Sequence, residues 1–141
     1  MPLTTSRMQD GRLVPFGLVV NGEAGRYISA LRMIVGPRWL ETYPARDDGE
    51  VLQLVRQGVP DAVVLDDEAT EVDPLKLLRR IRRLNEMTLV VLLTGRTDRL
   101  WLEEALRLAA FSVVVKPLRL EELLVQIHRM MIRMDMLLRR R

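Results

Sequence analysis

Residues 61–66 of the chain read Asp61-Ala62-Val63-Val64-Leu65-Asp66. The apolar residues in the middle follow one another without helical spacing, which is typical of a β-strand covered on both faces. Pro60 precedes this run, and Asp66 is the first polar residue after it. The stretch therefore predicts a buried strand with the Asp66 carboxylate at its carboxyl end.

Apolar runs and amphipathic stretches alternate on both sides of this strand. The clearest helix start is Asp73-Pro74, a capping residue followed by a proline that suits the first helical position. Strand followed by helix, five times over, predicts an α/β fold. We expect a three-layer, doubly wound, five-stranded parallel sheet of the flavodoxin-like type with an extended C-terminal helix. The expected strands are 18–20, 39–43, 62–65, 89–93 and 112–115, and the expected helices are 27–35, 51–58, 74–84, 98–109 and 121 onward.

The length of 141 residues predicts a single domain. We expect residues 1–12 to form a flexible leader, 13–128 the domain, and 129–141 an extension of the last helix with a basic tail. The chain has no cysteine, which excludes disulfides, zinc–thiolate sites and cysteine nucleophiles. No apolar run approaches the roughly 20 residues that a membrane helix needs. We therefore expect a cytoplasmic protein that has no membrane partner.

The formal charge of +3 resides in the last helix and tail, because the rest of the chain is formally neutral. Nucleic-acid binding through this tail, which ends in Arg139-Arg140-Arg141, is one alternative function. The neutral domain itself gives no reason to expect nucleic-acid binding. The arginines of 79–83 predict a solvated helix face or, alternatively, a docking surface for a partner.

Polar residues follow the apolar runs at the points where the strands are expected to end. They are Asn21, Asp66, Thr94 and Lys116, the last followed by Pro117. In a doubly wound sheet the carboxyl ends of the strands meet at one edge, where ligands bind. A carboxylate, a hydroxyl and an ammonium at that edge favour phosphoryl chemistry, with the carboxylate as nucleophile and the other two neutralising the transferred oxygens.

The same residues resemble the receiver domain of two-component response regulators. The resemblance rests on 61–66, Asp73, Leu89 to Gly95 and Val113 to Pro117, in order and at spacings of the kind that family shows. It implies that Asp66 accepts a phosphoryl group from a histidine kinase or phosphotransfer protein. It also implies that Thr94 hydrogen-bonds the phosphoryl oxygens, that Lys116 pairs with Asp66 or its phosphoryl group, and that the peptide bond before Pro117 is often cis.

The resemblance further implies an Mg²⁺ ion, held by Asp66, the backbone carbonyl of Glu68 and, weakly, Asn21. Such a domain is a signalling phosphoacceptor rather than an ordinary enzyme, at most catalysing its own phosphorylation and dephosphorylation. Lys116 has a second interpretation, as a structural ion pair with Asp66 that would survive the loss of phosphorylation.

Two departures from the family pattern favour an alternative. Asn21-Gly22 stands where the family has a pair of acidic residues that hold Mg²⁺, a hard ion that prefers carboxylates. Glu23 and Asp67 are nearby acids, but neither is in the usual place. Val113 stands where an aromatic residue normally couples phosphorylation to a surface change. The alternative is a degenerate receiver that acts by phosphorylation-independent contact or dimerisation.

The final helix carries a heptad-like apolar seam. Its members are Leu120, Leu123, Ile127, Met130, Met134 and Leu137. The first half suits packing on the sheet, whereas the part from Met130 onward is expected to project past the domain. We therefore expect either a homodimer through this helix or a connection to an output domain. His128, the only histidine, is expected to be a surface or packing residue.

Overall fold

The computed structural model describes residues 7–9 and 12–139. Its centre is a five-stranded parallel sheet in the order β4-β3-β5-β6-β7, which confirms the predicted fold. Each predicted strand is present, with ends displaced by no more than two residues. The strands are β3 (Phe16–Val20), β4 (Leu40–Pro44), β5 (Ala62–Asp66), β6 (Leu89–Thr94) and β7 (Ser112–Val115).

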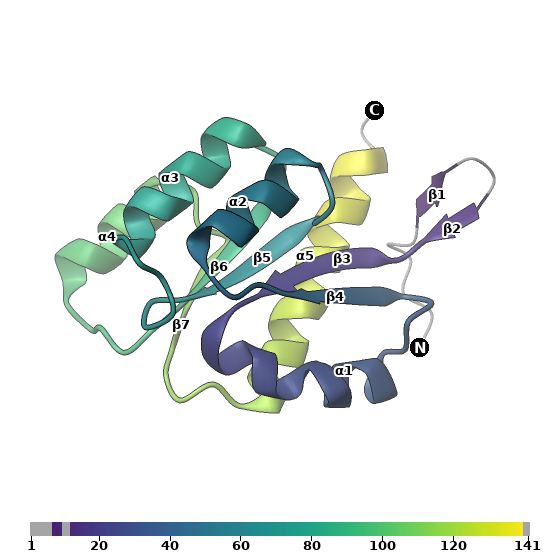
Figure 1. Cartoon of the computed structure of the whole chain (residues 1–141), viewed down its shortest axis with the longest axis horizontal. Helices are drawn as coiled ribbons and strands as arrows, with labels where there is room; N and C mark the ends of the chain where they lie inside the picture. Colours follow the sequence, from purple (N-terminus) through teal and green to yellow (C-terminus); the bar gives the residue numbers. More distant parts are fainter. Residues whose placement is uncertain (1–6, 10–11, 140–141) are drawn as a thin grey trace.

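Helices cover both faces of the sheet. Figure 1 shows α1 (Ile28–Ile34) and α5 (Leu120–Arg139) on one side and the other three helices, α2 (Asp48–Arg56), α3 (Pro74–Leu84) and α4 (Arg99–Arg107), on the other. Alternate residues of the strands belong to two separate buried clusters: Val64 faces the α1/α5 layer, and Val63 and Leu65 face the α2/α3/α4 layer. The continuous apolar runs of the sequence follow from this two-sided burial.

Two helix starts illustrate local sequence effects. Asp73 caps α3, as predicted, by accepting a hydrogen bond from the backbone N–H of Leu75 at 2.8 Å. Helix α2 begins at Asp48, three residues before the predicted start, because the Asp47 side chain accepts a hydrogen bond from the backbone N–H of Glu50 at 2.8 Å. The apolar periodicity begins only after this capped first turn, so periodicity alone placed the start too late.

The flexibility of the expected leader, residues 1–12, stays a prediction, but the described part of the segment before the sheet has secondary structure. It holds a short antiparallel pair, β1 (Arg7–Gln9) and β2 (Arg12–Val14), which forms a sheet of its own. Residues 1–6 and 10–11 lie outside the described residues. Asp10-Gly11 stands between the two strands in the sequence and is a pair that favours tight hairpin turns. This pair was the overlooked signal.

The predicted projection of the last helix past the domain is wrong. Met130, Met131 and Met134 are almost completely buried and belong to the same cluster as Phe16 and Leu40, the first residues of β3 and β4. The second half of α5 therefore covers the amino ends of the strands. The seam from Leu120 to Met134 therefore packs within the chain, and its methionines are not available for a coiled coil. Residues 140–141 of the basic tail lie outside the described residues.

Candidate functional site

The register of the parallel sheet brings the predicted site residues to its carboxyl edge. Asp66 at the end of β5 lies opposite Leu93, and Thr94 at the end of β6 lies opposite Val115. Lys116 follows Val115 directly, and its backbone N–H donates to the carbonyl of Thr94 at 2.8 Å. The three residues therefore lie on neighbouring strands at one edge, as the sequence predicted.

The Asp66 carboxylate is enclosed by hydrogen-bond donors. Its Oδ1 accepts from the backbone N–H of Glu68 at 2.9 Å and lies 2.5 Å from Lys116 Nζ. Its Oδ2 accepts from the backbone N–H of Glu23 at 2.7 Å. Burial raises the pKa of Asp66, but the hydrogen bonds from Lys116, Glu23 and Glu68 outweigh it, so the pKa lies below its ordinary value. Asp66 is therefore ionised at neutral pH although it is only 3% exposed.

Gly22 makes this enclosure possible. Its φ of +58° is in the left-handed region that favours glycine. A Cβ atom on residue 22 would lie 2.5 Å from Asp66 Oδ2 and 2.6 Å from Asp66 Cβ. The Asp66 side chain therefore occupies the space that a side chain at position 22 would need.

Asn21 is turned toward the backbone of β5. Its Oδ1 accepts from the backbone N–H of Asp66 at 2.6 Å, in a buried setting. Only the amide oxygen can accept this bond, so the orientation of the amide is decided by the N–H donor. The Nδ2 group is buried and has no hydrogen-bond partner among the described residues. Asn21 thus anchors the turn to the strand that carries Asp66.

Lys116 is surrounded by three consecutive carboxylates. Its Nζ lies 2.5 Å from Asp66 Oδ1, 2.7 Å from Glu68 Oε1 and 3.5 Å from Asp67 Oδ1. Burial lowers the pKa of Lys116, but the hydrogen bonds to Asp66 and Glu68 outweigh burial and raise the pKa above its ordinary value. The ammonium is therefore permanently charged at neutral pH. The peptide bond between Lys116 and Pro117 is cis, as the family resemblance implied.

Thr94 contacts Asp67 rather than Asp66. Its hydroxyl donates to Asp67 Oδ2 at 2.5 Å and accepts from the backbone N–H of Arg96 at 2.9 Å. Asp67 reaches this position because its backbone N–H continues the ladder, donating to the carbonyl of Leu93 at 2.9 Å. From the sequence, Asp67 was predicted only to be a nearby acid outside the usual position. The overlooked signal was its place one residue beyond a strand paired with the strand of Thr94.

Glu23 serves the loop after β7 and does not replace an acidic pair. Its Oε2 accepts from the backbone N–H of Leu118 at 2.8 Å. The Tyr27 hydroxyl donates to the carbonyl of the same residue at 2.7 Å. Both residues come from the 3₁₀ helix η1 (Gly22–Tyr27), so this short helix holds the loop that follows the cis peptide bond.

Comparison with known proteins identifies the family. The model of the response regulator receiver domain matches residues 26–128, a stretch that includes Asp66, Thr94 and Lys116. The chain belongs to the response-regulator receiver family. It is 36% identical over 83 residues to the regulatory protein AtoC of Escherichia coli, covering 59% of this chain and 18% of AtoC. It is 24% identical over 106 residues to the sporulation initiation phosphotransferase F of Bacillus subtilis, covering 75% of this chain and 85% of that protein.

Solved receiver structures share the fold. A CheY-like receiver domain protein from Methanospirillum hungatei superposes with a TM-score of 0.73 at 16% identity, covering 86% of this chain and 98% of that one. The chain spans under a fifth of AtoC, so the relative carries much more than a receiver domain. As a receiver domain, this chain is a signalling module of two-component systems.

In the described part of the chain, no helix is long and apolar enough to cross a membrane.

Receiver domains generally bind Mg²⁺ at an acidic site, and the residues of this receiver do not fit that ion. The Asn21 oxygen, which we expected to be a weak ligand, is occupied by the Asp66 N–H at 2.6 Å. Gly22 offers no side chain, and Asp66 fills the space beside it. Within residues 7–9 and 12–139 there is no cluster of three or more acidic or histidine side chains arranged for a metal. The role of the Glu68 backbone carbonyl as a metal ligand stays a prediction.

Val113 stays a departure from the family pattern in the receiver structure. It lies on β7 and is half-buried against the α2/α3/α4 layer. Its branched side chain has one dominant rotamer in most settings and no ring to swing between a buried and an exposed position. An aromatic switch at this place is therefore missing.

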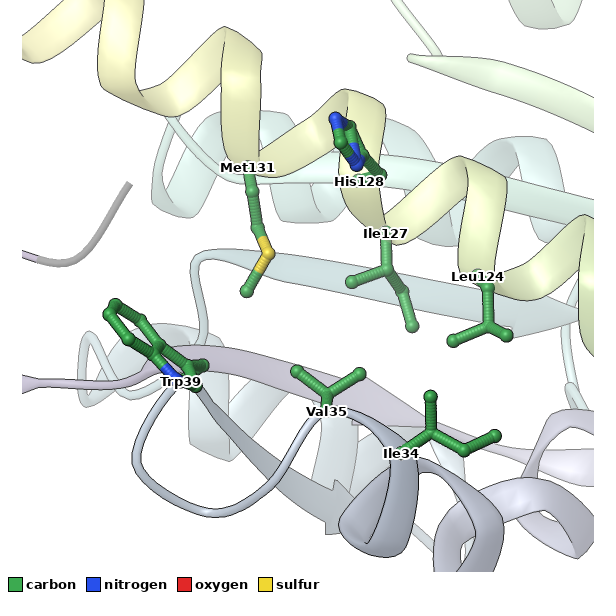
Figure 2. A pocket seen from close by; sticks show the side chains of 7 residues that line it. All are labelled: Ile34, Val35, Trp39, Leu124, Ile127, His128 and Met131. Carbon is green, nitrogen blue, oxygen red and sulfur yellow. The ribbon is translucent and has the colours of Figure 1, made fainter. Parts of the chain in front are cut away.

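An apolar pocket lies away from this edge of the receiver. A pocket of about 340 Å³ lies between the end of α1 and the middle of α5. Trp39, which lines it, directly precedes β4, so the pocket is at the amino ends of the strands. Figure 2 shows Leu124, Ile127 and Met131 pointing toward the α1 side, whereas the His128 ring points away from it. His128 is half-buried at the rim, in agreement with a surface or packing role.

Proposed function

We propose that this receiver relays a two-component signal by accepting a phosphoryl group on Asp66 from the phosphohistidine of a histidine kinase or phosphotransfer protein. The observation that carries the proposal is the enclosure of the Asp66 carboxylate by Lys116 and the backbone N–H groups of Glu23 and Glu68. These donors keep the nucleophile ionised. They also lie where negative charge develops on transferred oxygens, the arrangement that stabilises phosphoryl transfer.

The proposed step is a displacement at phosphorus. One oxygen of Asp66 attacks the phosphorus atom, the phosphorus–nitrogen bond of the donor breaks, and the imidazole leaves with the electron pair of that bond. The product is an acyl phosphate on Asp66. Lys116 then pairs with a phosphoryl oxygen instead of a carboxylate oxygen, since its ammonium has three donors and can follow the charge.

The wider setting is also a proposal. A receiver of this kind acts through contacts with its partners rather than on a substrate of its own, and we propose that it does so in the cytoplasm. Because a relative such as AtoC is much longer than this chain, the output of the pathway lies beyond what this chain itself indicates.

One observation favours a second candidate, a receiver that works without phosphorylation. Asn21 and Gly22 are committed to holding Asp66 in place, so neither supplies a metal ligand. Without a divalent cation, the negative charge that accumulates during transfer is opposed only by Lys116 and the backbone N–H groups. In this candidate the ion pair between Asp66 and Lys116 is a structural link between β5 and β7.

Incubation with acetyl phosphate, with and without Mg²⁺, separates the two candidates. The proposed function predicts one phosphoryl increment by intact mass in the native chain and none in Asp66→Asn. The matched control is Asp98→Asn, an exposed aspartate paired with Arg96, which should be labelled like the native chain. No adduct in the native chain under any of these conditions would decide for the second candidate.

A further inference from the structure

The hydroxyl of Thr94 and the ammonium of Lys116 converge on one anion, and that anion belongs to the chain. Asp67 Oδ2 accepts from the Thr94 hydroxyl at 2.5 Å. Asp67 Oδ1 lies 3.5 Å from Lys116 Nζ. A single carboxylate therefore bridges the two side chains at the end of β6 and β7 that could otherwise receive an external oxyanion.

The hydroxyl of Thr94 has no capacity left for a second acceptor. It has one hydrogen, and this hydrogen is donated to Asp67. Its lone pairs already accept the backbone N–H of Arg96 at 2.9 Å, which fixes the direction of the hydroxyl. A phosphoryl oxygen that is to be bound by Thr94 must therefore displace the Asp67 carboxylate.

The local charge opposes the arrival of another anion. Asp66, Asp67 and Glu68 present three carboxylates around the single ammonium of Lys116. Asp67 Oδ1 is buried and has no hydrogen-bond partner in the part of the chain that the structure describes. This oxygen faces the Lys116 ammonium at 3.5 Å, but that cation is shared with Asp66 and Glu68. The buried Asp67 carboxylate therefore repels an approaching anion more strongly than a solvated carboxylate would.

We propose that Asp67 is an internal occupant of an oxyanion site formed by Thr94 and Lys116, and that it competes there with a phosphoryl group on Asp66. The second half of this proposal rests on the proposed function, whereas the first half concerns oxyanion binding alone. The contact of Asp67 with Thr94 and Lys116 opposes oxyanion binding. The two donors are already in position, but the Asp67 carboxylate occupies them. Removing the Asp67 side chain should therefore expose a working site for a tetrahedral oxyanion.

Two substitutions separate the effects of the charge and of the hydrogen bond. Asp67→Ala removes both the carboxylate and the acceptor of the Thr94 hydroxyl. Asp67→Asn removes the charge but keeps an oxygen that can accept from Thr94. If the occupant acts by competition for Thr94, Asp67→Ala binds inorganic phosphate at least about tenfold more tightly than the native chain, since a hydrogen bond to a charged group is regained. The phosphate affinity of Asp67→Asn should lie between those of the native chain and Asp67→Ala.

The binding experiment is a titration of each variant with inorganic phosphate, followed by the amide signals of Arg96 and Lys116 in ¹H–¹⁵N NMR spectra. The Arg96 amide reports on the Thr94 hydroxyl because the two are hydrogen-bonded. Asp67→Ala combined with Thr94→Val should lose the phosphate affinity that Asp67→Ala gains. The charge control is Glu68→Gln, which removes another carboxylate from Lys116 but leaves the bond between Thr94 and Asp67 in place.

The phosphate affinities of the Asp67 and Glu68 variants decide whether Asp67 competes for Thr94. A gain in Asp67→Ala that needs Thr94 and is absent in Glu68→Gln supports the proposal. Equal gains in Asp67→Ala and Glu68→Gln, or no gain in either Asp67 variant when both are folded by circular dichroism, overturn it. The spectra of Asp67→Asn, which is nearly isosteric, keep the test decisive where Asp67→Ala fails to fold.

Labelling with acetyl phosphate distinguishes this inference from the proposed function. Faster labelling of Asp66 in Asp67→Ala than in the native chain supports both the competition by Asp67 and the proposed function. Phosphate binding by Asp67→Ala without any labelling of Asp66 keeps the oxyanion site and overturns the proposed function. If the native chain is labelled rapidly and neither Asp67→Ala nor Asp67→Asn changes the labelling rate of Asp66, Asp67 does not compete with the phosphoryl group.

Discussion

Replacing Gly22 by alanine should be one of the most damaging small changes in this domain. The first cost is conformational, because a φ of +58° costs a residue with a Cβ about 1–2 kcal/mol. The second is steric: the new Cβ would lie 2.5 Å from Asp66 Oδ2 and 2.7 Å from Asp66 Cγ. Overpacking of this kind costs about 1–3 kcal/mol. We therefore expect Gly22→Ala to lower the free energy of unfolding by about 2–5 kcal/mol.

Two other glycines provide matched controls. Gly36 has a φ of +88° but nothing within 4 Å of a built Cβ, so Gly36→Ala measures the conformational cost alone. Gly25 has neither a positive φ nor a neighbour within 4 Å, so Gly25→Ala should change the stability little or raise it slightly. Urea unfolding followed by circular dichroism gives all three free energies on one scale.

A double substitution isolates the steric clash between residue 22 and Asp66. Asp66→Gly removes the side chain that a residue at position 22 would strike, so Gly22→Ala should be less costly in that background by about 1–3 kcal/mol. A Gly22→Ala cost equal to that of Gly36→Ala, with no coupling to Asp66, would refute the close approach of Asp66 to the turn. The same result would mean that the Asp66 side chain does not exclude an acidic side chain from position 22.

Three further predictions concern packing, capping and pH. Met130→Ala should lower the free energy of unfolding by about 2–5 kcal/mol in urea, because the side chain is fully buried, whereas Met136→Ala, half-exposed on the same helix, should change it by less than about 1 kcal/mol. Asp47→Ala should cost about 1 kcal/mol in thermal unfolding, since it removes the cap of α2, and Asp98→Ala, whose side chain makes no capping bond, should cost less. The folded-state pKa of Asp66 lies below its unfolded value, so its contribution to stability is present above about pH 4 and lost as the pH falls further. Between pH 6 and 3 Asp66→Asn should therefore lose less stability than the native chain, and parallel pH curves would contradict the lowered pKa.

Much of the fold followed from sequence patterns because strands and helices differ in the period of their apolar residues. Five apolar runs separated by amphipathic stretches predicted the parallel sheet, and the polar residue after each run predicted the composition of its carboxyl edge. Asp66, Thr94 and Lys116 do lie on neighbouring strands there. Helix α2 begins earlier than its apolar periodicity predicted, because its first turn depends on the capping residue Asp47. The short strands β1 and β2 were not predicted, because three residues are too few to show a period.

The last helix shows why an apolar pattern alone does not identify a binding surface. Its heptad-like spacing suits a coiled coil and a core-facing helix equally well, since both need an apolar stripe of similar period. Met130 and Met134 are buried over the first residues of β3 and β4, which the spacing of α5 by itself does not reveal. How much of the apolar face of α5 is buried depends on how far the sheet extends beneath the helix.

The sequence by itself determined which chemical groups stand at the edge of the sheet, because the apolar runs and the polar residues that follow them mark where each strand ends. The tertiary structure alone decided which partner each group takes. Thr94 binds Asp67, Asn21 binds the backbone of Asp66, and Asp66 rests over Gly22. These choices depend on the left-handed turn at residue 22 and on one further rung of pairing between β5 and β6. Hydrogen bonds form or fail within tenths of an ångström, and such distances are settled by the packed backbone rather than by residue spacing.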